Sequence, residues 1–490
     1  MTYTIEKVTT LIGARRYGDR DGNVGFILTD SRSLCFPEET LFFALKSERN
    51  DGHNYIPELY RRGVRNFVVS QVPKGYASDY PEANFLKVVN TLEALQRLAE
   101  RHRDEFNIPI VGITGSNGKT MVKEWLHQLL SPSMFVTRSP RSYNSQIGVP
   151  LSVWLLNEQT QVGVFEAGIS QPGEMLALRD IIQPTIAVLT YLGAAHQENF
   201  ESLEAKCREK IILFHDADTI VYNGDDKTVS GVVNEYKDYK GEKLFWSFRD
   251  TKAPFFVKNV EKKGNLSIIT YIYKGEEDSY SLPFIDEASV TNSIIAAVVS
   301  RRLGLSAEEL DKRMALLEPV AMRLEVKEGQ HGCTLINDSY NSDINSLDIA
   351  LDFMSRRPDH KGRRHTLILS DIFQSGESAK DLYHEVSDLC RKRGVVKFIG
   401  IGPQLCSQSD EIQISEKFFF SNVEEFIDSE VFKSLRDEVI LLKGARQFGF
   451  DQLTELLVRK VHETTLEVNL NAVVANLNYY RAFMKPETKL

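Results

Sequence analysis

The stretch 112–130, GITGSNGKTMVKEWLHQLL, holds the residues with the clearest capacity for chemistry. Glycines let backbone N–H groups face an anion, and the N-terminus of a following helix adds a favourable dipole. Lys119 can reach the β- and γ-phosphates of a nucleotide, and the Thr120 hydroxyl can ligate Mg²⁺. The common spacing G-x-x-x-x-G-K-[ST] would place glycine at Ile113. The stretch therefore predicts a phosphate-binding loop of another spacing; the alternative is a helix-capping turn with a surface lysine.

The segments around this loop predict the elements that position it. The apolar run 108–114 predicts a buried strand, and residues 119–130 have apolar side chains at helical spacing. A helix near 55–62 and a strand at 67–70 are predicted before them. Further strands are predicted at 162–166, 185–190, 219–223 and 244–248, most with helical segments between. Such alternation indicates an α/β fold with a mainly parallel sheet covered by helices.

From about residue 319 the alternation of predicted strands and helices begins again, which predicts a second α/β unit. Its strands are predicted at 333–338, 365–371, 396–402 and 439–444, with helices at 345–356 and 378–393. In open α/β sheets, ligands bind at the carboxyl ends of the strands. Polar residues stand at these ends, namely Glu166, the loop 190–196, Asn223, Asp338, Asp371 and Lys443. For any one of them, ordinary loop polarity is the alternative.

The composition limits the class of protein. A chain of 490 residues suggests about three domains. The net charge of −9 and the lack of a long basic run argue against nucleic acid as a partner. The five cysteines show no CxxC spacing, which suits a reducing cytoplasm. No signal-type apolar core and no apolar run near 18 residues is found, so we expect no membrane span.

The spacing TGSNGKT resembles the loop of the Mur ligase family, ATP-dependent amide ligases of bacterial peptidoglycan synthesis. The resemblance implies a three-domain α/β architecture with a central P-loop domain on a parallel sheet and a C-terminal Rossmann-like domain. The implied domains are 1–105, which binds a UDP-sugar, 106–318, which binds ATP, and 319–462, the Rossmann-like ligase domain. In the loop itself, the implied ATP-binding residues are Gly115, Ser116, Asn117, Gly118, Lys119 and Thr120.

Two later segments, VFEAGISQPGEM (164–175) and TYLGAAHQENFESLEAKCREK (190–210), are similar to family segments that bind metal. They imply that Glu166 and Thr120 ligate one Mg²⁺ ion and that His196 ligates a second. The family's lysine that carries CO₂ as a carbamate follows its histidine by fourteen residues, which is Lys210 here; Lys206 is the competing candidate. The implied cofactors are ATP, two Mg²⁺ ions and CO₂ as lysine carbamate. The implied catalytic residues are Lys119, His196 and Lys210.

Further segments resemble the rest of the family's nucleotide site, namely ASVTNSIIAA (288–297), MRLEV (322–326) and INDSYNSDINSL (336–347). The first departs from the family pattern, with Ala288 and Ser289 in place of its histidine and first asparagine. The ATP-binding residues implied by these segments are Asn292, Arg323, Asp338, Tyr340 and Asn341.

The first and last motifs indicate the substrates. TDSRSLCFPEETLFFALKSERNDGHNYI (29–56) and LLKGAR (441–446) resemble family segments and imply the substrate-binding residues Ser31, Arg32, Asp51, Gly52, His53, Lys443 and Arg446. D-S-Y-N is typical of the branch that joins D-alanyl-D-alanine to UDP-N-acetylmuramoyl-tripeptide through an acyl phosphate. The resemblance therefore implies these two partners and a cytoplasmic enzyme, with no nucleic acid or membrane. The alternatives are a ligase of the folylpolyglutamate synthetase type and a non-catalytic nucleotide-binding scaffold.

The final segment, TTLEVNLNAVVANLNYYRAFMKPETKL (464–490), resembles instead the opening of a fold-type III alanine racemase. The resemblance implies that 463–490 is the truncated start of a racemase domain and that the chain is the ligase half of a fusion. Pyridoxal phosphate is expected only in the missing racemase part, and no racemase activity is expected here. We expect a monomer for this chain and a dimer through the racemase part of the fusion. The alternative is a C-terminal helix of the ligase.

Overall fold

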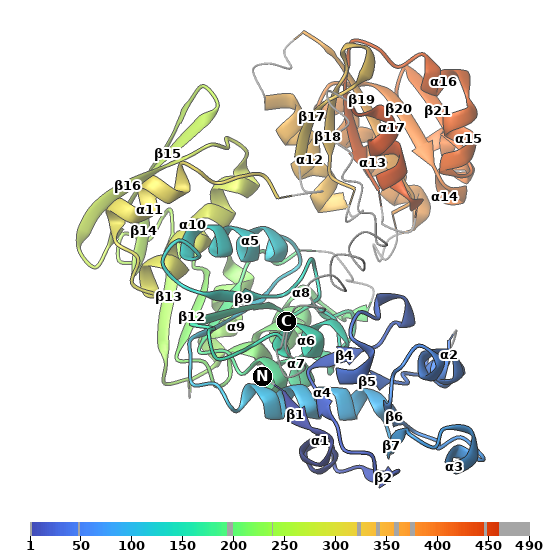
Figure 1. The fold of residues 1–490 in the computed structure, drawn as a ribbon. Helices are drawn as coiled ribbons and strands as arrows, with labels where there is room; N and C mark the ends of the chain where they lie inside the picture. The colour runs from blue at the N-terminus through green and yellow to red at the C-terminus, as the bar shows by residue number, and fades with distance from the viewer. Residues whose placement is uncertain are drawn as a thin grey trace, which may run out of the picture.

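A computed structural model of the chain describes residues 2–47, 50–193, 199–237, 239–320, 325–339, 344–356, 362–372, 378–444 and 448–459. Three large sheets follow one another along the chain, each with its own helices (Figure 1). We call them the first, middle and third units. The predicted domain boundaries after residues 105 and 318 fall between these sheets, although the exact boundaries stay predictions. The predicted α/β class is confirmed.

The first unit has a five-stranded sheet in the order β2-β7-β6-β5-β4. Strands β4 to β7 are parallel, and β2 is antiparallel to β7. A small pair, β1 with β3, lies beside it. The bounds are β1 Tyr3–Thr4, α1 Ile5–Ile12, β2 Arg15–Tyr17, β3 Asn23–Val24, β4 Phe26–Leu28, β5 Thr40–Phe43, α2 Ile56–Arg61, β6 Asn66–Val69, α3 Tyr76–Asp79, β7 Asn84–Lys87 and α4 Thr91–Arg103.

The middle unit has a nine-stranded sheet in the order β16-β15-β14-β13-β12-β11-β8-β10-β9. In the order of the sheet, the strands from β9 at one edge to β14 are parallel. The strands β14, β15 and β16 form an antiparallel meander that extends the other edge. The bounds are β8 Ile110–Thr114, α5 Lys119–Leu130, β9 Val136–Arg138, α6 Gly148–Val153, β10 Val162–Glu166, α7 Glu174–Ile182, β11 Ile186–Leu189, α8 Leu203–Ile211, β12 Thr219–Asn223, α9 Lys227–Glu235, β13 Glu242–Ser247, β14 Phe255–Lys263, β15 Leu266–Tyr273, β16 Glu276–Leu282, α10 Glu287–Arg302 and α11 Ala307–Met314.

The third unit has a six-stranded sheet in the order β17-β18-β22-β19-β20-β21, parallel except for the pair β17–β18. The bounds are β17 Glu325–Glu328, β18 Thr334–Asn337, α12 Ile344–Arg356, β19 Arg364–Ser370, α13 Ala379–Lys392, β20 Val395–Ile401, α14 Pro403–Ser407, β21 Glu416–Phe420, α15 Val423–Asp428, α16 Glu430–Lys433, β22 Glu438–Lys443 and α17 Phe450–Leu457. The strands predicted in the middle and third units are therefore confirmed, each to within two residues at either end.

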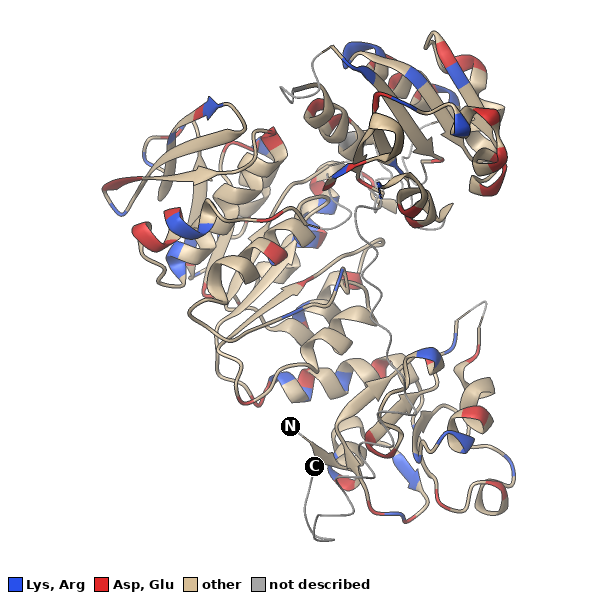
Figure 2. Cartoon of the chain, turned by 45° about the horizontal axis from the view of Figure 1, so that its top comes forward, with Lys and Arg blue, Asp and Glu red and all other residues tan. Residues whose placement is uncertain are grey.

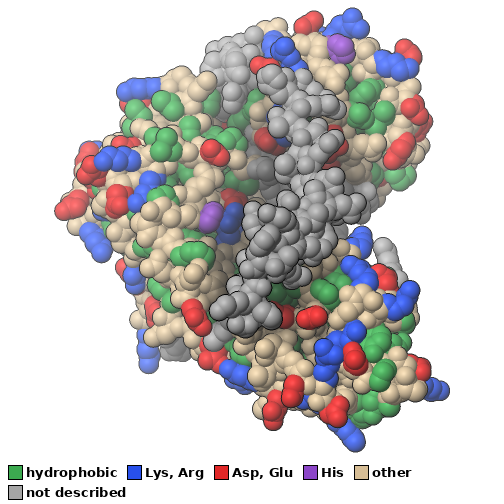
Figure 3. Space-filling view, in the orientation of Figure 1, with side chains coloured by type: hydrophobic (Ala, Val, Ile, Leu, Met, Phe, Trp, Pro, Cys, Tyr) green, Lys and Arg blue, Asp and Glu red, His purple; other side chains and the backbone are tan. Residues whose placement is uncertain are grey.

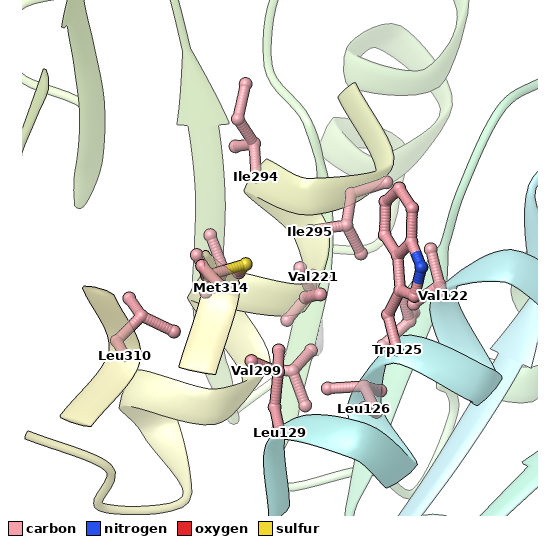
Figure 4. Packing of buried hydrophobic residues seen from close by; sticks show 14 of the residues in the cluster. Val122, Trp125, Leu126, Leu129, Val221, Ile294, Ile295, Val299, Leu310 and Met314 are labelled. Carbon is pink, nitrogen blue, oxygen red and sulfur yellow. The ribbon is translucent and has the colours of Figure 1, made fainter. Parts of the chain in front are cut away.

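The core of the middle unit lies on both faces of its sheet. On one face, the apolar side of α5 packs against α10 and α11 over the strands, with Trp125, Leu129, Ile295 and Met314 among the buried residues (Figure 4). On the other face, α6, α7, α8 and α9 cover the same strands. This three-layer packing fixes the start of α5 at the carboxyl end of β8, which is the place that a phosphate loop requires.

The helix α4 joins the first unit to the middle unit. It contacts α1 in its own unit and both α6 and α7 in the middle unit. The Arg103 guanidinium donates hydrogen bonds to the carbonyl oxygens of Ile182 at 3.0 Å and Gln183 at 3.0 Å. The His102 ring lies 4.6 Å from the Trp154 ring of the middle unit. The first and middle units therefore share a packed and hydrogen-bonded junction.

Charges of both signs are interspersed over the three units (Figure 2), and the face in Figure 3 shows the same mixture. The expectation that nucleic acid is not a partner stays a prediction. Within the described ranges, none of the helices combines the length and the apolar character that crossing a membrane requires.

Candidate active site

The predicted phosphate loop connects the end of β8 to the start of α5, as its residues require. Gly115 and Gly118 have φ angles of +145° and +88°, in the region that favours glycine. A Cβ atom at Gly115 would lie 2.1 Å from Thr190 Oγ1, and one at Gly118 would lie 2.5 Å from Asn292 Oδ1. Both glycines are thus fixed by backbone conformation and by close neighbours. Asn292, predicted at the nucleotide, is thereby placed against the loop.

The segment after β11 holds the loop in shape. The Ser116 N–H donates to the Tyr191 carbonyl at 2.6 Å, and the Ser116 hydroxyl donates to the Gly193 carbonyl at 3.0 Å. The Thr190 hydroxyl donates to the Asn117 carbonyl at 2.5 Å. Gly118 provides no side-chain cap for α5, so the helix start offers its N–H groups to an anion. Among the described residues, the buried Asn117 Nδ2 has no hydrogen-bond partner, which also fits a polar ligand.

Two lysines contact a carbonyl of this loop, and a third contacts the segment after β11 that supports it. Lys119 Nζ donates to the Gly115 carbonyl at 2.6 Å, and Lys210 Nζ donates to the same oxygen at 3.4 Å. Lys206 Nζ donates to the Gly193 carbonyl, and both Lys206 and Lys210 are buried. Burial lowers the pKa of Lys210 well below its usual value, and the charges of Lys119 and Lys206 lower it further. A neutral lysine amine is the form that captures CO₂, so the environment of Lys210 suits a carbamate.

Glu166 ends β10 beside the first turn of α5, and its carboxylate is completely buried. The Thr120 hydroxyl donates to Glu166 Oε2 at 3.1 Å and lies 3.0 Å from the Ser142 hydroxyl. Glu166 Oε1 is buried, and the ammonium of Lys123 lies 3.2 Å from it. A partly buried hydroxyl and a buried carboxylate form an all-oxygen donor set, which Mg²⁺ prefers. Thr120 and Glu166 therefore fit the predicted magnesium site.

The sequence reasoning missed several residues that surround Glu166. Lys123 Nζ lies 3.2 Å from Glu166 Oε1, and both side chains are fully buried. The Glu166 N–H donates to the Ser139 hydroxyl at 3.2 Å, and Asn144 Nδ2 approaches Glu166 Oε2 at 3.5 Å. One signal could have found Lys123: it is a lysine on the apolar face of α5, next to Val122 and Leu126. The partners of Lys123 lie too far along the chain for a local pattern to reveal.

In the third unit, Asp338 and Lys443 stand at the carboxyl ends of the neighbouring strands β18 and β22. Lys443 Nζ donates to Asp338 Oδ2 at 2.6 Å, and both residues are buried. Asp371, at the end of β19, accepts hydrogen bonds from the N–H groups of Gln404 and Leu405 at 3.0 and 2.8 Å. Asp338, predicted for the ribose, and Lys443, predicted for the substrate, are therefore brought together.

In the first unit, the predicted substrate residues Asp51, Gly52 and His53 form a tight turn at the end of β5. His53 Nδ1 donates to Asp51 Oδ1 at 2.6 Å, and His53 Nε2 accepts from the Ser70 N–H at 3.1 Å. The hydrogen bonds from His53 lower the pKa of Asp51. A Cβ atom at Gly52 would lie 2.8 Å from the Ala44 backbone. The turn is thus tied to the ends of β5 and β6.

Ser31 and Arg32 lie in a short 3₁₀ turn near that edge of the sheet. The Arg32 guanidinium forms an exposed ion pair with Asp30 at 2.6 Å, and the Ser31 carbonyl accepts from Arg62 at 2.8 Å. The remaining predicted site residues, His196, Arg323, Tyr340, Asn341 and Arg446, lie outside the described residues, as does the racemase-like segment 463–490. Their assignments stay predictions.

Fold and site together define the class: a three-unit α/β protein with a phosphate loop and, beside it, a threonine hydroxyl bonded to a buried glutamate. Residues 113–300 match the family model described as "Mur ligase middle domain". The UDP-N-acetylmuramoyl-tripeptide–D-alanyl-D-alanine ligase of Bacillus subtilis is 28% identical over 368 residues, covering 73% of this chain and 76% of the relative.

Two solved structures are similar to the whole fold. MurF from Acinetobacter baumannii has a TM-score of 0.80 at 21% identity, covering 93% of this chain and 99% of that one. MurF from Thermotoga maritima in complex with ADP has a TM-score of 0.73 at 22% identity, covering 91% of this chain and 97% of that one.

The chain therefore contains the middle domain of the Mur ligases, a family of ATP-dependent ligases. It is a homologue of the UDP-N-acetylmuramoyl-tripeptide–D-alanyl-D-alanine ligases. The family expected from the phosphate loop is thus confirmed.

Proposed function

We propose that the chain joins D-alanyl-D-alanine to UDP-N-acetylmuramoyl-tripeptide and converts ATP to ADP and phosphate. The observation that carries this proposal is the convergence of Lys119, Lys210 and the Thr120–Glu166 pair at one loop. Burial and the charges of Lys119 and Lys206 lower the pKa of Lys210, which favours the neutral amine that takes up CO₂. The names of the relatives supply the two substrates.

The reaction has two steps that the chain's residues promote by position and charge. The tripeptide carboxylate attacks the γ-phosphorus of ATP, giving an acyl phosphate and ADP. The amine of D-alanyl-D-alanine then attacks the acyl carbon, and phosphate leaves as the amide forms and the amine loses a proton. Neither step needs a protein nucleophile, so catalysis consists of positioning and charge neutralisation.

The phosphate loop and Lys119 would hold the β- and γ-phosphates. Thr120 and Glu166 would hold one Mg²⁺ ion; His196 and a Lys210 carbamate are the proposed ligands of a second. Bound Mg²⁺ would offset the negative charges that the carboxylate and the phosphates bring together. Asp338 would hold the ribose, with Asn292, Arg323, Tyr340 and Asn341 completing the nucleotide site. The first unit, through Ser31, Arg32 and the 51–53 turn, would bind the UDP end.

We place the enzyme in the cytoplasm. All five cysteines are free thiols, which suits a reducing compartment. A monomeric state for this chain and the fusion to a racemase stay predictions.

The test is phosphate release from ATP by the purified chain with Mg²⁺, UDP-N-acetylmuramoyl-tripeptide and D-alanyl-D-alanine, each omitted in turn. We expect release only when all are present, with formation of the pentapeptide product confirmed by mass spectrometry. ATP binding without turnover on any muramoyl peptide would favour the scaffold alternative. Turnover that instead requires a folate and glutamate would favour the folylpolyglutamate synthetase alternative.

A further inference from the structure

Lys123 is a fully buried charged residue at the candidate magnesium site that the proposed mechanism does not use. It lies one helical turn after Thr120 on α5, and its side chain is 0% exposed. Its ammonium lies 3.2 Å from Glu166 Oε1 and 2.9 Å from Glu124 Oε1. Removing an ammonium from water is costly unless it is paired and hydrogen-bonded. Two carboxylates satisfy that condition here.

The charges of this cluster balance. Glu124 also pairs with Arg138, whose Nε lies 2.9 Å from Glu124 Oε2. Lys123 and Arg138 together thus offset Glu124 and Glu166. Because Arg138 faces Glu124, Lys123 is the cation next to the buried Glu166 carboxylate.

The two oxygens of Glu166 have different neighbours. Oε1 faces Lys123, whereas Oε2 accepts from the Thr120 hydroxyl at 3.1 Å. A carboxylate rotates freely about its last bond unless both oxygens are constrained. The ammonium on one side and the hydroxyl on the other therefore set the plane of this carboxylate.

Lys123 also holds the loop that faces Thr120. Its ammonium donates to the Ser139 carbonyl at 2.9 Å and to the Arg141 carbonyl. Arg141 has a φ of +50°, a conformation that a non-glycine residue adopts at a cost. The next residue, Ser142, places its hydroxyl 3.0 Å from Thr120 Oγ1. One side chain thus connects Glu166, the 139–142 loop and the surroundings of Thr120.

We propose that Lys123 is a positioning residue of the magnesium–nucleotide site: it fixes the Glu166 carboxylate and the 139–142 loop around Thr120. The inference rests on the proposed function only in taking Thr120 and Glu166 as magnesium ligands. Outer partners of metal ligands commonly contribute about 10- to 100-fold to metal affinity. A lysine that merely opposed the charge of the metal would have the reverse effect, so the two roles differ in sign.

The experiment measures ADP binding by calorimetry at increasing Mg²⁺ concentration in the full chain and in Lys123→Met. We expect the Mg²⁺ concentration for half-maximal enhancement to rise about 10- to 100-fold. ADP binding without Mg²⁺ should stay within about 3-fold of the original, or ~0.7 kcal/mol. An unchanged or lower Mg²⁺ requirement overturns the proposal, as does an equal loss of ADP binding without Mg²⁺.

Lys397→Met is the matched control. Lys397 is also a buried lysine, paired with the buried Glu438 at 2.9 Å in the third unit, away from the phosphate loop. We expect it to lose stability without a change in Mg²⁺ requirement. If both variants shift the requirement equally, the effect is a general one of losing a buried charge, and the proposal fails.

A variant-free measurement covers the case in which Lys123→Met does not fold. A crystal structure of the full chain with Mg²⁺ and ADP should show Lys123 still in contact with Glu166 and with the Ser139 carbonyl. A Lys123 side chain displaced from Glu166 by the metal overturns the proposal. Because the readouts are nucleotide and metal binding, a chain that binds both but lacks ligase activity refutes the proposed function and leaves this inference standing.

Discussion

At the residue scale, the phosphate loop shows how buried charge can be used to set reactivity. Lys210 is buried among cationic neighbours, and each of these features disfavours its ammonium form. Lys206, one helical turn earlier on α8, shares the burial and is the competing candidate for the carbamate. The two lysines contact different carbonyls, those of Gly115 and Gly193, so substituting each in turn can show which one carries the carbamate.

We predict a carbamate carbon signal in ¹³C NMR of the chain equilibrated with labelled bicarbonate. Lys210→Met should abolish the signal, whereas Lys206→Met should retain it. Removing the Lys206 charge raises the pKa of Lys210, so in Lys206→Met the signal should reach half its maximum at a higher pH than in the original chain. A signal lost in Lys206→Met and kept in Lys210→Met would assign the carbamate to the other lysine.

The glycines of the loop allow a second prediction at this scale. Gly118→Ala and Gly173→Ala both place alanine at the start of a helix with similar φ angles, +88° and +85°. Each should lose about 1–2 kcal/mol of stability from the left-handed backbone. A Cβ at Gly118 also meets Asn292 Oδ1 at 2.5 Å, whereas one at Gly173 meets nothing within 4 Å.

Calorimetry should therefore show weaker ADP binding in Gly118→Ala only. The double variant Gly118→Ala with Asn292→Ala should recover part of the extra stability loss in thermal unfolding. Equal effects of Gly118→Ala and Gly173→Ala on ADP binding would contradict a specific role for the Gly118–Asn292 contact.

Local sequence predicted much of the site at this scale, but only the residues with a recognisable spacing. The loop glycines, Lys119, Thr120 and the strand-end Glu166 follow from position next to a strand or helix. The place of Lys123 on the apolar face of α5 was a usable signal, but its partners Ser139 and Glu166 could not be predicted because they lie in other segments of the chain. Such contacts between distant segments have no periodic signature in the chain.

At the element scale, most of the central parallel strands of the middle and third units were predicted, whereas the antiparallel edge was not. Strands such as β10 are buried at every residue and read as continuous apolar runs. In β15, buried residues alternate with more exposed ones, as in a sheet with one face toward solvent. The more exposed positions of β15 nevertheless carry Leu266, Ile268 and Ile272, so the sequence itself shows no apolar–polar alternation there. The strands β14, β15 and β16 were not predicted, nor were the parallel strands β5, β9 and β21.

The helix α4 carries a prediction about pH. Burial lowers the pKa of His102 to about 4, and its ring accepts from the Tyr3 hydroxyl at 2.8 Å and donates to the Leu156 carbonyl at 3.0 Å. The unfolded chain binds a proton near pH 6.5, and the folded chain does not until about pH 4. The neutral ring therefore makes its whole contribution to the free energy of unfolding above pH 6.5. This contribution, roughly 3 kcal/mol, is lost as the pH falls toward 4.

Urea unfolding between pH 7 and pH 4 tests this prediction. His102→Gln should be less stable at pH 7 by about 1–3 kcal/mol, because buried hydrogen bonds are lost, and its stability should depend less on pH. The exposed His215→Gln serves as the control and should follow the original chain. A pH dependence that is unchanged in His102→Gln would contradict the prediction.

At the scale of the whole molecule, the three units are unequally connected. Trp154 of the middle unit belongs to a hydrophobic cluster of the first unit, and Ala99 of α4 belongs to a cluster of the middle unit. The two hydrophobic clusters of the third unit contain only residues from 326 onward. Burial raises the pKa of Asp286 at the start of α10, and the charge of Asp352 on α12 adds to that effect.

This difference predicts that the third unit moves when substrates bind, while the first and middle units stay one body. The proposed ribose ligand Asp338 lies on the third unit and the phosphate loop on the middle unit, so closure must bring them to one nucleotide.

Distances between spin labels test this prediction. Labels at Lys252 and Lys380 span the middle and third units, and labels at Lys74 and Lys252 span the first and middle units. Cys35 and Cys406, the cysteines that are not buried, are replaced by serine to prevent extra labelling. With ADP, Mg²⁺ and UDP-N-acetylmuramoyl-tripeptide, the distance between labels should shorten for Lys252–Lys380 and stay constant for Lys74–Lys252. A change confined to Lys74–Lys252 would show that the packed junction at α4 is the hinge, against the shared core and the Arg103 hydrogen bonds seen there.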